Sequence, residues 1–281
     1  MHIVVCIKQV PDSAQIRVHP VTNTIMRQGV PAIINPYDLY ALEEALRIKD
    51  QYGGYITALT MGPPMAEGAL RKAISYGADD AVLVTDRIFA GSDTLATSFA
   101  LSTAIQQIHK NMAVDLVFTG KQTIDGDTAQ VGPGIAKRLD MQLLTYVSKI
   151  RALDMEAKEI VVERRSEGGV QVIKTSVPCL VTVLEGNNEM RFASMNNMFR
   201  ASRFPVKIWN GAQAGIEDVT KAGLKGSPTV VFKVFAPTPR AIKAEIIQCE
   251  SNDPKDLSET LLAKLFTAHP KLEREIVSHD A

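Results

Sequence analysis

The stretch VDLVFTGKQTIDGDTAQVGPGIAKRL, residues 114–139, decides the fold class. Its start, VDLVF, predicts a buried strand, and its end, GIAKRL (134–139), predicts a helix. Residues 119–133 between them hold three glycines, two aspartates, two glutamines and three threonines, with Lys121 as the single positive charge. A buried strand that leads through a polar, glycine-containing loop into a helix is typical of α/β proteins with a parallel sheet.

The first two-thirds of the chain repeat this alternation of strand and helix. Apolar runs predict further strands at 3–7, 55–61 and 81–85, and helices are expected at 34–50, at 65–77 and from Ser92 to about Lys110. Asn35 is a good N-cap and Asp38 is placed to close a capping box, so the helix over 34–50 has a clear start. The pattern predicts an α/β fold with a doubly wound, mostly parallel sheet, in which ligands bind at the carboxyl ends of the strands.

From about residue 145 the pattern changes. SKIRALD, EIVVERR and VQVIKTSVPCLVTVLEG predict an added antiparallel portion, with a turn at 167–169. Beyond Pro205 the sequence predicts an arm with a strand over TVVFKVF, a helix near Leu257–Phe266 and a loosely ordered last dozen residues. We therefore expect two domains, an α/β domain over residues 1–205 and a C-terminal arm over residues 206–281.

The composition excludes several classes of protein. Lys and Arg total 31, as do Asp and Glu, so the net charge is zero and offers no electrostatic footprint for nucleic acid. The start MHIVVCIKQV lacks the features of a signal peptide, and no run approaches the ~18 apolar residues of a membrane span. The three cysteines and five histidines show no metal-ligand spacing. We expect a cytoplasmic protein with no metal, no transmembrane segment and no nucleic-acid partner.

Small and polar residues gather at the ends of the predicted strands. Small residues let the backbone approach a ligand, and N–H groups at helix starts favour phosphate, so this set is typical of a nucleotide cradle. The loop has neither GxxxxGK[ST] nor GxGxxG, and no Ser/His/Asp set is apparent. One alternative stays open, in which the loop only caps the next helix through Asp127 or Thr128. The positions at these ends are Cys6, Asn35, Asp38, Met61, Gly62 and residues 120–131.

Six segments, in order along the chain, resemble the beta subunit of electron-transfer flavoproteins. They are KQVPD (8–12), NPYDLYALEEALRIKD (35–50), GADDAVLV (77–84), GKQTIDGDTAQVGP (120–133), ERRSEGG (163–169) and NNEMRFASMNNMFRA (187–201). The resemblance runs from residue 1 to about 205 and is much weaker in the arm. It implies a Rossmann-like sheet of the adenine nucleotide alpha hydrolase kind. It also implies a heterodimer with an alpha subunit that carries FAD, on which the arm packs.

The resemblance also bears on the ligand of the beta site. AMP-binding relatives typically read GKQAIDDDxNQTG, with Asp and Asn at the positions of Gly126 and Ala129. Bifurcating and Fix-type relatives read GxQxxDGDTAQVGP, which this sequence matches. Gly126 removes a side chain and a charge, and Ala129 is smaller than Asn, so both changes make room for a bulkier, diphosphate-bearing ligand. The resemblance therefore implies FAD, with AMP as the alternative.

Carried over position by position, the resemblance implies fifteen cofactor-binding residues and no catalytic residue. Lys121 faces solvent or phosphate, and the sequence leaves both open. The cofactor-binding residues are Cys6, Asn35, Asp38, Met61, Gly62, Gly120, Gln122, Thr123, Asp125, Gly126, Asp127, Thr128, Ala129, Gln130 and Val131.

Two further segments resemble contact regions of the family. NEMRFASMNNMFRA resembles the loop that recognises a dehydrogenase, and it places Met195 at the apolar anchor, where a flexible side chain suits an adaptable contact. The alternative is a methionine packed in the subunit core. Arg164 and Arg165 lie in the segment that approaches the alpha-subunit FAD, where a cation stabilises a reduced, anionic flavin. The alternative there is an exposed, charged strand.

The function implied is that of a beta subunit in an electron-bifurcating heterodimer. FAD in the beta site would take a hydride from NADH. One electron would go to ferredoxin or flavodoxin, and the other would pass through the second FAD, in the alpha subunit, to an acyl-CoA or other dehydrogenase. One alternative is a non-bifurcating beta subunit with a structural AMP that carries electrons from acyl-CoA dehydrogenases. A stand-alone nucleotide-binding protein is the third, and the order of the motifs argues against it.

Overall fold

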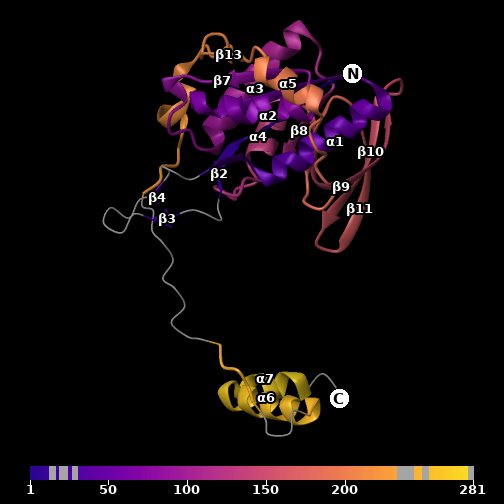
Figure 1. Ribbon diagram of the computed structural model, residues 1–281, viewed down its shortest axis with the longest axis vertical. Helices are drawn as coiled ribbons and strands as arrows, with labels where there is room; N and C mark the ends of the chain where they lie inside the picture. Colours follow the sequence, from indigo (N-terminus) through magenta and orange to yellow (C-terminus); the bar gives the residue numbers. More distant parts are fainter. Residues whose placement is uncertain (13–16, 19–24, 27–30, 233–243, 249–252, 278–281) are drawn as a thin grey trace. The chain divides into compact units, whose positions relative to one another are not determined.

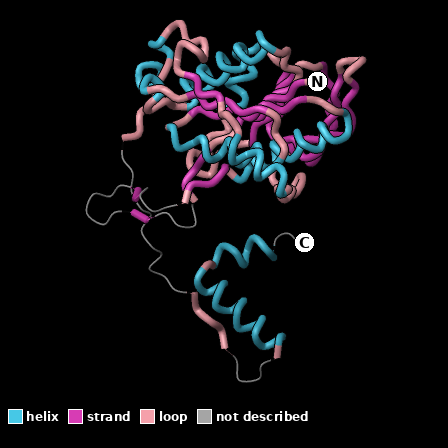
Figure 2. Tube along the Cα trace, turned by 45° about the horizontal axis from the view of Figure 1, so that its top comes forward, coloured by secondary structure: helices cyan, strands magenta, loops and turns pink. Residues whose placement is uncertain are grey.

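The structure is a computed structural model that describes residues 1–12, 17–18, 25–26, 31–232, 244–248 and 253–277 (Figure 1). Residues Met1–Phe235 form one compact unit and Ala236–Ala281 form a second. The first unit carries the central sheet and its helices, and the described part of the second consists mainly of two helices (Figure 2).

A nine-stranded sheet forms the centre of the first unit, in the order β11-β10-β9-β12-β8-β1-β6-β7-β13. All neighbours from β9 to β13 pair in parallel, whereas β10 pairs antiparallel with both β9 and β11. The doubly wound, mostly parallel sheet predicted from the sequence is confirmed. The strands are β1 (His2–Cys6), β6 (Tyr55–Met61), β7 (Asp80–Val84), β8 (Leu116–Gly120), β9 (Gln142–Asp154), β10 (Glu159–Ser166), β11 (Gly169–Ser176), β12 (Cys179–Val183) and β13 (Lys207–Trp209).

Helices cover both faces of this sheet because its central strands are buried on both sides. Along β1, Ile3 and Val5 pack with the helices of one face, and Val4 and Cys6 pack with those of the other. This alternation is the two-residue period of a strand. Helices α1 (Pro36–Tyr52) and α2 (Glu67–Tyr76) belong to the first face, and α3 (Thr94–Asn111) and α4 (Val131–Leu139) to the second. Two short antiparallel pairs lie outside the sheet, β2 (Gln9–Pro11) with β5 (Ala32–Ile34) and β3 (Arg17–Val18) with β4 (Ile25–Met26).

The antiparallel portion differs from the prediction in one strand. The run VQVIKTSVPCLVTVLEG contains two strands, and only the first, β11, is antiparallel to its neighbour. The second, β12, lies between β8 and β9 and is parallel to both. All five residues of β12 are buried, and a strand that is apolar on both faces is stable only inside a covered sheet. Helix α4 also begins earlier than expected, at Val131.

Residues beyond 205 divide between the two units. β13 pairs with β7, and the compact unit continues to Phe235, past the domain boundary expected near residue 205. Of the strand expected over TVVFKVF, residues 229–232 have no regular structure and the rest lie outside the described residues. Short 3-10 turns, η4 (Val219–Lys221) and η5 (Gly223–Gly226), precede it.

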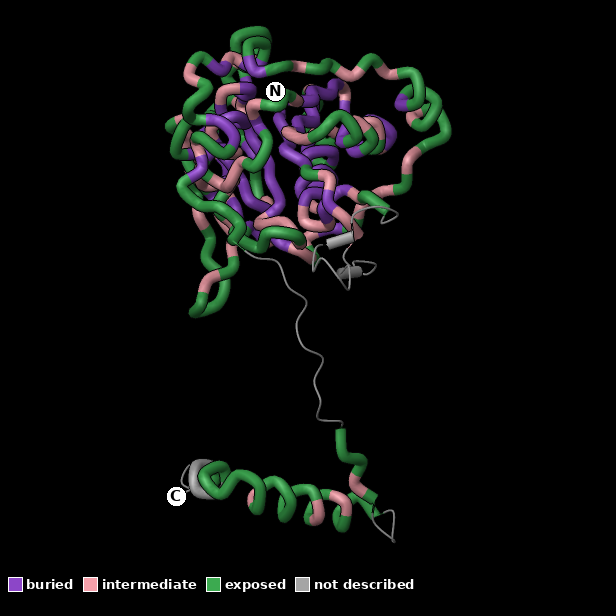
Figure 3. The backbone as a smooth tube through the Cα atoms, turned by 90° about the vertical axis from the view of Figure 1, so that its left-hand side faces the viewer, coloured by how far each residue is buried: buried purple, intermediate pink, exposed green. Residues whose placement is uncertain are grey.

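The second unit is helical. The helix predicted near Leu257–Phe266 is confirmed as α6 (Pro254–Ala268). The loosely ordered last dozen residues are a wrong prediction for residues 270–277, which form α7 (Pro270–Val277) with proline at its first position, and residues 278–281 lie outside the described residues. No residue of α6 is buried, in contrast to the interior of the first unit (Figure 3). Among the described residues, no helix has the length and apolar character to cross a membrane.

Candidate functional site

The order of the strands reverses between β1 and β8. From β1 the chain moves outward to β6 and β7, and it then returns to β8 on the other side of β1. Ligands of open α/β sheets bind outside the carboxyl ends of the strands at such a switch point. Cys6 ends β1, Met61 ends β6 and Gly120 ends β8, so the fold places these predicted residues at the carboxyl edge.

Asp38, on the first turn of α1, connects the two strand ends at the switch point. Its Oδ2 accepts the backbone N–H of Lys8 at 2.8 Å, and its Oδ1 accepts the backbone N–H of Gly120 at 3.1 Å. Lys8 follows β1 and Gly120 is the last residue of β8. The side chain therefore does not close a capping box, which corrects the sequence prediction, because it bonds to distant backbone instead.

Asn35 has a similar role on the loop that follows β8, residues 121–130 (the 121–130 loop). Its Nδ2 donates to the carbonyl of Gln122 at 2.9 Å, and its Oδ1 accepts the N–H of Ile124 at 3.2 Å. Its own N–H donates to the carbonyl of Lys8 at 2.8 Å. Asn35 occupies the N-cap position of α1, as predicted, but its side chain forms no cap hydrogen bond there. It is fully buried and fixes the path of the 121–130 loop.

The side chain of Lys8 also attaches the 121–130 loop, on its exposed side. Its Nζ donates to both carboxylate oxygens of Asp125, at 2.8 and 2.7 Å. Partial burial acts to raise the pKa of the Asp125 carboxyl, but the hydrogen bond and charge of Lys8 outweigh it and hold the pKa below its usual value. Lys8 was not among the predicted site residues, although it begins the KQVPD segment quoted for the resemblance.

The 121–130 loop has a strained backbone. Asp127 and Ala129 both adopt a φ of 54°, the left-handed region that residues other than glycine rarely enter. Asp127 accepts a hydrogen bond from the Gln122 side chain, and Gln130 accepts one from Thr94 at 2.7 Å. Helix α4 starts with Gln130 at the N-cap position and no side-chain cap. The alternative that Asp127 or Thr128 caps this helix is therefore wrong.

Glycine is required at Gly120 but not at Gly126. A Cβ at Gly120 would lie 2.5 Å from Oδ1 of Asp38 and 2.6 Å from the backbone of Tyr37, so α1 can approach β8 only at a glycine. A Cβ at Gly126 would meet only the Thr123 hydroxyl, at 3.4 Å, an ordinary contact. Residues 125–128 are exposed, so this part of the loop is accessible from outside the subunit.

Comparison with known proteins identifies the family of the chain. The family model described as "Electron transfer flavoprotein domain" matches residues 22–220. Protein FixA of Azotobacter vinelandii is 70% identical over 276 residues, which cover 98% of this chain and 98% of the relative. Protein FixA of Sinorhizobium fredii is 63% identical over 279 residues, 99% of this chain and 98% of the relative.

The chain belongs to the electron transfer flavoprotein family. The electron transfer flavoprotein subunit beta of Thermoanaerobacterium thermosaccharolyticum is 45% identical over 271 residues, 96% of this chain and 99% of the relative. Together these matches make the chain an electron transfer flavoprotein beta subunit, as its sequence motifs predict.

The remaining predicted residues of this beta subunit differ in how they are held. Cys6 is buried, and burial raises the pKa of its thiol to about 12, so it is a neutral packing residue. Met61 packs against the core of the α3 and α4 face. Gly62 donates its N–H to the carbonyl of Val84 at 3.1 Å. All three lie at the carboxyl ends of β1 and β6, beside the loops that Asp38 and Asn35 connect.

Arg164 and Arg165 of the β10–β11 hairpin have different partners. The guanidinium of Arg164 is bound within its own sheet, to the carbonyl and hydroxyl of Thr145 at 2.9 Å each and to Gln171 at 3.1 Å. Arg165 is exposed and forms an ion pair with Glu185 at 3.5 Å. Arg164 therefore braces the hairpin, and Arg165 presents the more available charge.

Glu185 also binds Lys121, which settles the position of that residue. The Lys121 Nζ lies 2.9 Å from Oε2 of Glu185 and 4.9 Å from the centre of the Tyr37 ring. Burial acts to lower the pKa of Lys121, but its hydrogen bond to Glu185 outweighs this and raises the pKa. Lys121 is thus engaged with protein on the hairpin side of the loop. Sequence reasoning missed Glu185, because no local pattern indicates an ion pair across 64 residues.

Residues 187–203 (the 187–203 loop, which includes helix α5, Met195–Arg203) are attached by their polar side chains. Arg191 donates to both oxygens of buried Glu43, at 2.9 and 3.0 Å. Asn188 donates to Glu44 at 3.0 Å. Two apolar side chains of this loop are exposed, Met195 by 66% and Phe192 fully, whereas Met190 packs against the core. Met195 is therefore not packed in the core, the alternative that the sequence left open.

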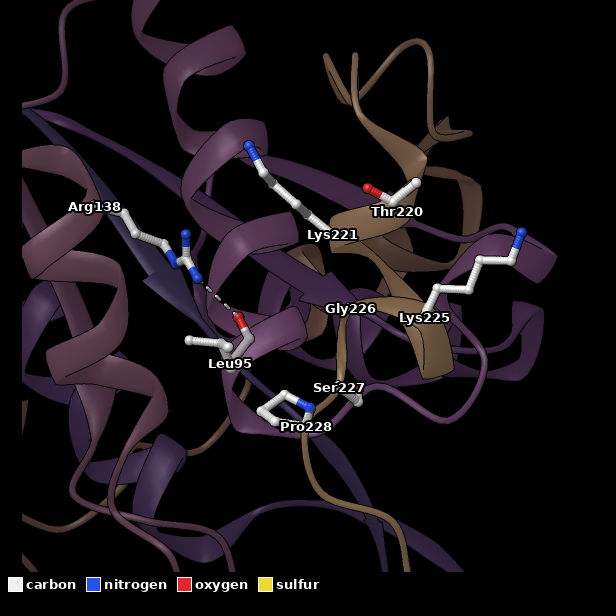
Figure 4. Close-up of a pocket in the computed structure, with 8 residues that line it drawn as sticks. All are labelled: Leu95, Arg138, Thr220, Lys221, Lys225, Gly226, Ser227 and Pro228. Atoms are coloured by element: carbon white, nitrogen blue, oxygen red, sulfur yellow. Dashed lines mark hydrogen bonds between the residues drawn. The ribbon is translucent and has the colours of Figure 1, made fainter.

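A cavity of about 340 Å³ lies elsewhere, between α3, α4 and the η4–η5 segment (Figure 4). Leu95, Arg138 and Pro228 are among its lining residues. Arg138 donates to the carbonyl of Leu95 at 3.3 Å, and the side chains of Lys221 and Lys225 point in different directions (Figure 4). None of the predicted cofactor-binding residues lines this cavity, and its cations do not converge on one point.

Proposed function

We propose that this beta subunit binds FAD at the switch point between β1 and β8 and works in an electron-bifurcating heterodimer. The observation that carries the proposal is that the ends of three neighbouring strands, at Cys6, Met61 and Gly120, lie at one edge of the sheet, where β8 leads into the 121–130 loop. Buried Asn35 and Asp38 hold that loop, so it keeps its shape before a ligand binds.

The strain in the 121–130 loop favours FAD over AMP. Ala129 adopts a left-handed conformation that costs a residue with a Cβ about 1–2 kcal/mol, and asparagine, found in AMP-binding relatives, tolerates it better. Alanine at this position therefore indicates that the space beside the side chain is more important there than a relaxed backbone conformation. The open space at Gly126 adds to that room on the exposed side of the loop.

The residues of this chain fit a dinucleotide with a diphosphate. FAD, when bound, would supply the acceptor for a hydride from NADH and the means to release electrons singly. The chain itself would bind and orient the group. Gly126 leaves space for it on the exposed side of the loop, and Asp38 and Asn35 fix the loop. The ion pair of Lys8 with Asp125 keeps this carboxylate from repelling an anionic ligand.

The proposed partners follow from the surfaces left uncovered. An alpha subunit with the second FAD would cover the arm, whose helix α6 buries none of its residues in the described structure. Arg165, the more available of the two hairpin arginines, would approach that second FAD. An acyl-CoA or other dehydrogenase would contact Met195, and ferredoxin or flavodoxin would accept the other electron. NADH and ferredoxin are cytoplasmic carriers, so the proposal places the complex in the cytoplasm.

An anaerobic titration with NADH tests this function. The alpha–beta complex is purified, and the absorbance of oxidised flavin is followed as NADH is added. We expect NADH to reduce two flavins per heterodimer when no other electron acceptor is present, and added oxidised ferredoxin to take electrons from them. A complex that holds a single flavin and is not reduced by NADH would overturn the proposal and favour the alternative beta subunit with a structural AMP.

A further inference from the structure

Asp38 is a buried carboxylate whose two oxygens serve two different strand ends. It is 5% exposed, and it binds the N–H of Lys8 beyond β1 and the N–H of Gly120 at the end of β8. These are the two strands that flank the switch point. The backbones of β1 and β8 pair as far as Val5 with Phe118, and beyond that point one side chain from a third element, α1, bridges the two chain segments.

There is little free space around the contact between Asp38 and Gly120. The space beside Gly120 is too small for a Cβ, which would lie 2.5 Å from Oδ1 of Asp38. Asn35, one turn earlier, holds the continuation of β8 at Gln122 and Ile124. A shift of the Asp38 carboxyl would thus be transmitted to the start of the 121–130 loop.

The ionisation of Asp38 decides how strongly both bonds form. A carboxylate is a strong acceptor at both oxygens, whereas protonation turns one oxygen into an O–H group, which is a weaker acceptor and needs an acceptor of its own. Burial raises the pKa of the Asp38 carboxyl to about 7, against hydrogen bonds from Asn35, Lys8 and Gly120 that lower it. Its ionisation therefore changes within the physiological range.

Other ionisable groups lie near Asp38 on the elements packed around it. Along β1 and beyond it, the Cys6 thiol has its pKa raised to about 12 by burial, and the Lys8 ammonium is paired with Asp125. On α1, Tyr37 lies under the ammonium of Lys121, which is paired with Glu185 beyond β12. Asp125, on the 121–130 loop, has a lowered pKa and stays ionised.

We propose that Asp38 is a positioning residue that links nucleotide binding to pH. The ionised carboxylate holds the ends of β1 and β8 at the spacing that the nucleotide requires, and protonation weakens its bond to one of them. The inference rests on the proposed nucleotide site and goes beyond it, because it assigns Asp38 to the protein side of the site rather than to a ligand contact.

The sign of the effect differs between binding and folding. Nucleotide affinity rises with pH, because the ionised form holds both strand ends more strongly. The stability of the nucleotide-free chain changes in the opposite direction. A carboxyl whose pKa is raised from 3.8 to about 7 binds its proton more tightly in the folded state, so this group's contribution to stability falls as pH rises through that window.

The test is a calorimetric titration of the full-length chain with FAD, and in parallel with AMP, between pH 6 and 8. If only the ionised form binds, the dissociation constant of the wild type falls about tenfold over this range. We expect Asp38→Asn to bind weakly at pH 8 and to lose the pH dependence, because an amide presents one acceptor and one donor. The ratio of wild-type to variant affinity at each pH removes any titration of the ligand.

A matched control separates the proposed positioning role of Asp38 from the effect of burying any carboxylate. Asp80 is also a buried carboxylate, and it accepts a backbone N–H and a lysine, but it begins β7 at the opposite edge of the sheet. Asp80→Asn should keep the wild-type pH profile. If Asp38→Asn does not fold, as judged by circular dichroism, Asp38→Ser gives the same comparison.

The outcomes distinguish this inference from the proposed function. The positioning role of Asp38 would be overturned if the wild-type affinity stayed constant or fell as the pH rises. It would also be overturned if Asp38→Asn showed the same pH profile as the wild type. Either result would leave the proposed nucleotide site in place. If neither FAD nor AMP binds at any pH, and neither copurifies with the alpha–beta complex, both the proposed nucleotide site and the positioning role of Asp38 are wrong.

Discussion

Two loops of this beta subunit are held by the same helix and yet present opposite surfaces. The 121–130 loop is tied to the start of α1 by Asn35, and Asp38 fixes the strand end before it. The 187–203 loop is tied to the middle of α1 through Glu43 and Glu44. In both cases buried polar side chains bond to distant backbone or side-chain groups.

The difference lies in what each loop leaves outside. The 121–130 loop exposes small residues and strained backbone, which suit a ligand that makes hydrogen bonds. The 187–203 loop exposes large apolar side chains, Phe192 and Met195 among them, which suit a protein surface. One helix thus supports two surfaces of different character, and each should be disturbed separately when its own attachment is removed.

The largest effect is expected for Gly120→Ala. The new Cβ would overlap both Asp38 and the backbone of Tyr37, so α1 or β8 must shift at a cost of about 1–3 kcal/mol. We expect bound nucleotide to be lost and the midpoint of chemical denaturation to fall. Gly168→Ala is the control, because a Cβ there meets nothing within 4 Å. Equal nucleotide content in the two variants would refute the close approach at Gly120.

Arg191→Ala should loosen the second loop and spare the first. It leaves the Glu43 carboxylate, 4% exposed, without its two-pronged partner, which costs about 1.5–3 kcal/mol. Arg47 also forms an ion pair with the Glu43 carboxylate, at 3.3 Å, but its side chain is 50% exposed. Both members of this pair lie on α1, so the pair does not attach the 187–203 loop. Arg47→Ala should therefore change the free energy of unfolding by less than about 1 kcal/mol. A larger loss for Arg47→Ala than for Arg191→Ala would contradict this assignment.

Met195→Ala should weaken contact with the dehydrogenase without changing the fold. Its side chain is 66% exposed, so truncation removes little internal packing, whereas loss of an interface anchor costs over about 1 kcal/mol. We expect electron transfer from the reduced complex to its dehydrogenase to slow several-fold at low partner concentration. Met65 is a matched control because it is 67% exposed on another surface. The same slowing for Met65→Ala would mean that Met195 has no special role.

The smallest effect is expected for Ala129→Asn. Asparagine tolerates the left-handed backbone, so the nucleotide-free chain should gain about 0.5–1 kcal/mol in stability, while the larger side chain reduces FAD affinity. Lys158, in the β9–β10 turn, has a φ of 52°. Lys158→Asn should give the same gain in thermal unfolding with no change in FAD affinity. If Ala129→Asn binds FAD more tightly than the wild type, the interpretation that Ala129 leaves space for FAD is wrong.

The sequence predicted the parallel sheet because its central strands leave a strong local signal. Strands β1, β7, β8 and β12 are buried at every position, and such apolar runs are visible without any tertiary information. The place of β12 in the sheet was not predictable in this way. Burial on both faces shows that a strand is central, but not which neighbours it pairs with.

The roles of Asn35 and Asp38 show a second limit. Both residues stand where a helix cap is expected, and local spacing favours that role. The structure gives their hydrogen bonds to Gln122, Ile124 and Gly120, which are more than 80 residues away. A sequence pattern identifies residues that form hydrogen bonds, whereas the choice between a local and a distant partner depends on the packing of α1 against β8.

The central claim, that the switch point of this beta subunit holds FAD, is tested most directly by the nucleotide content of the alpha–beta complex. The complex is denatured, and the released nucleotides are separated and counted against the protein. The account predicts two FAD per heterodimer and no AMP. One FAD together with one AMP would contradict it.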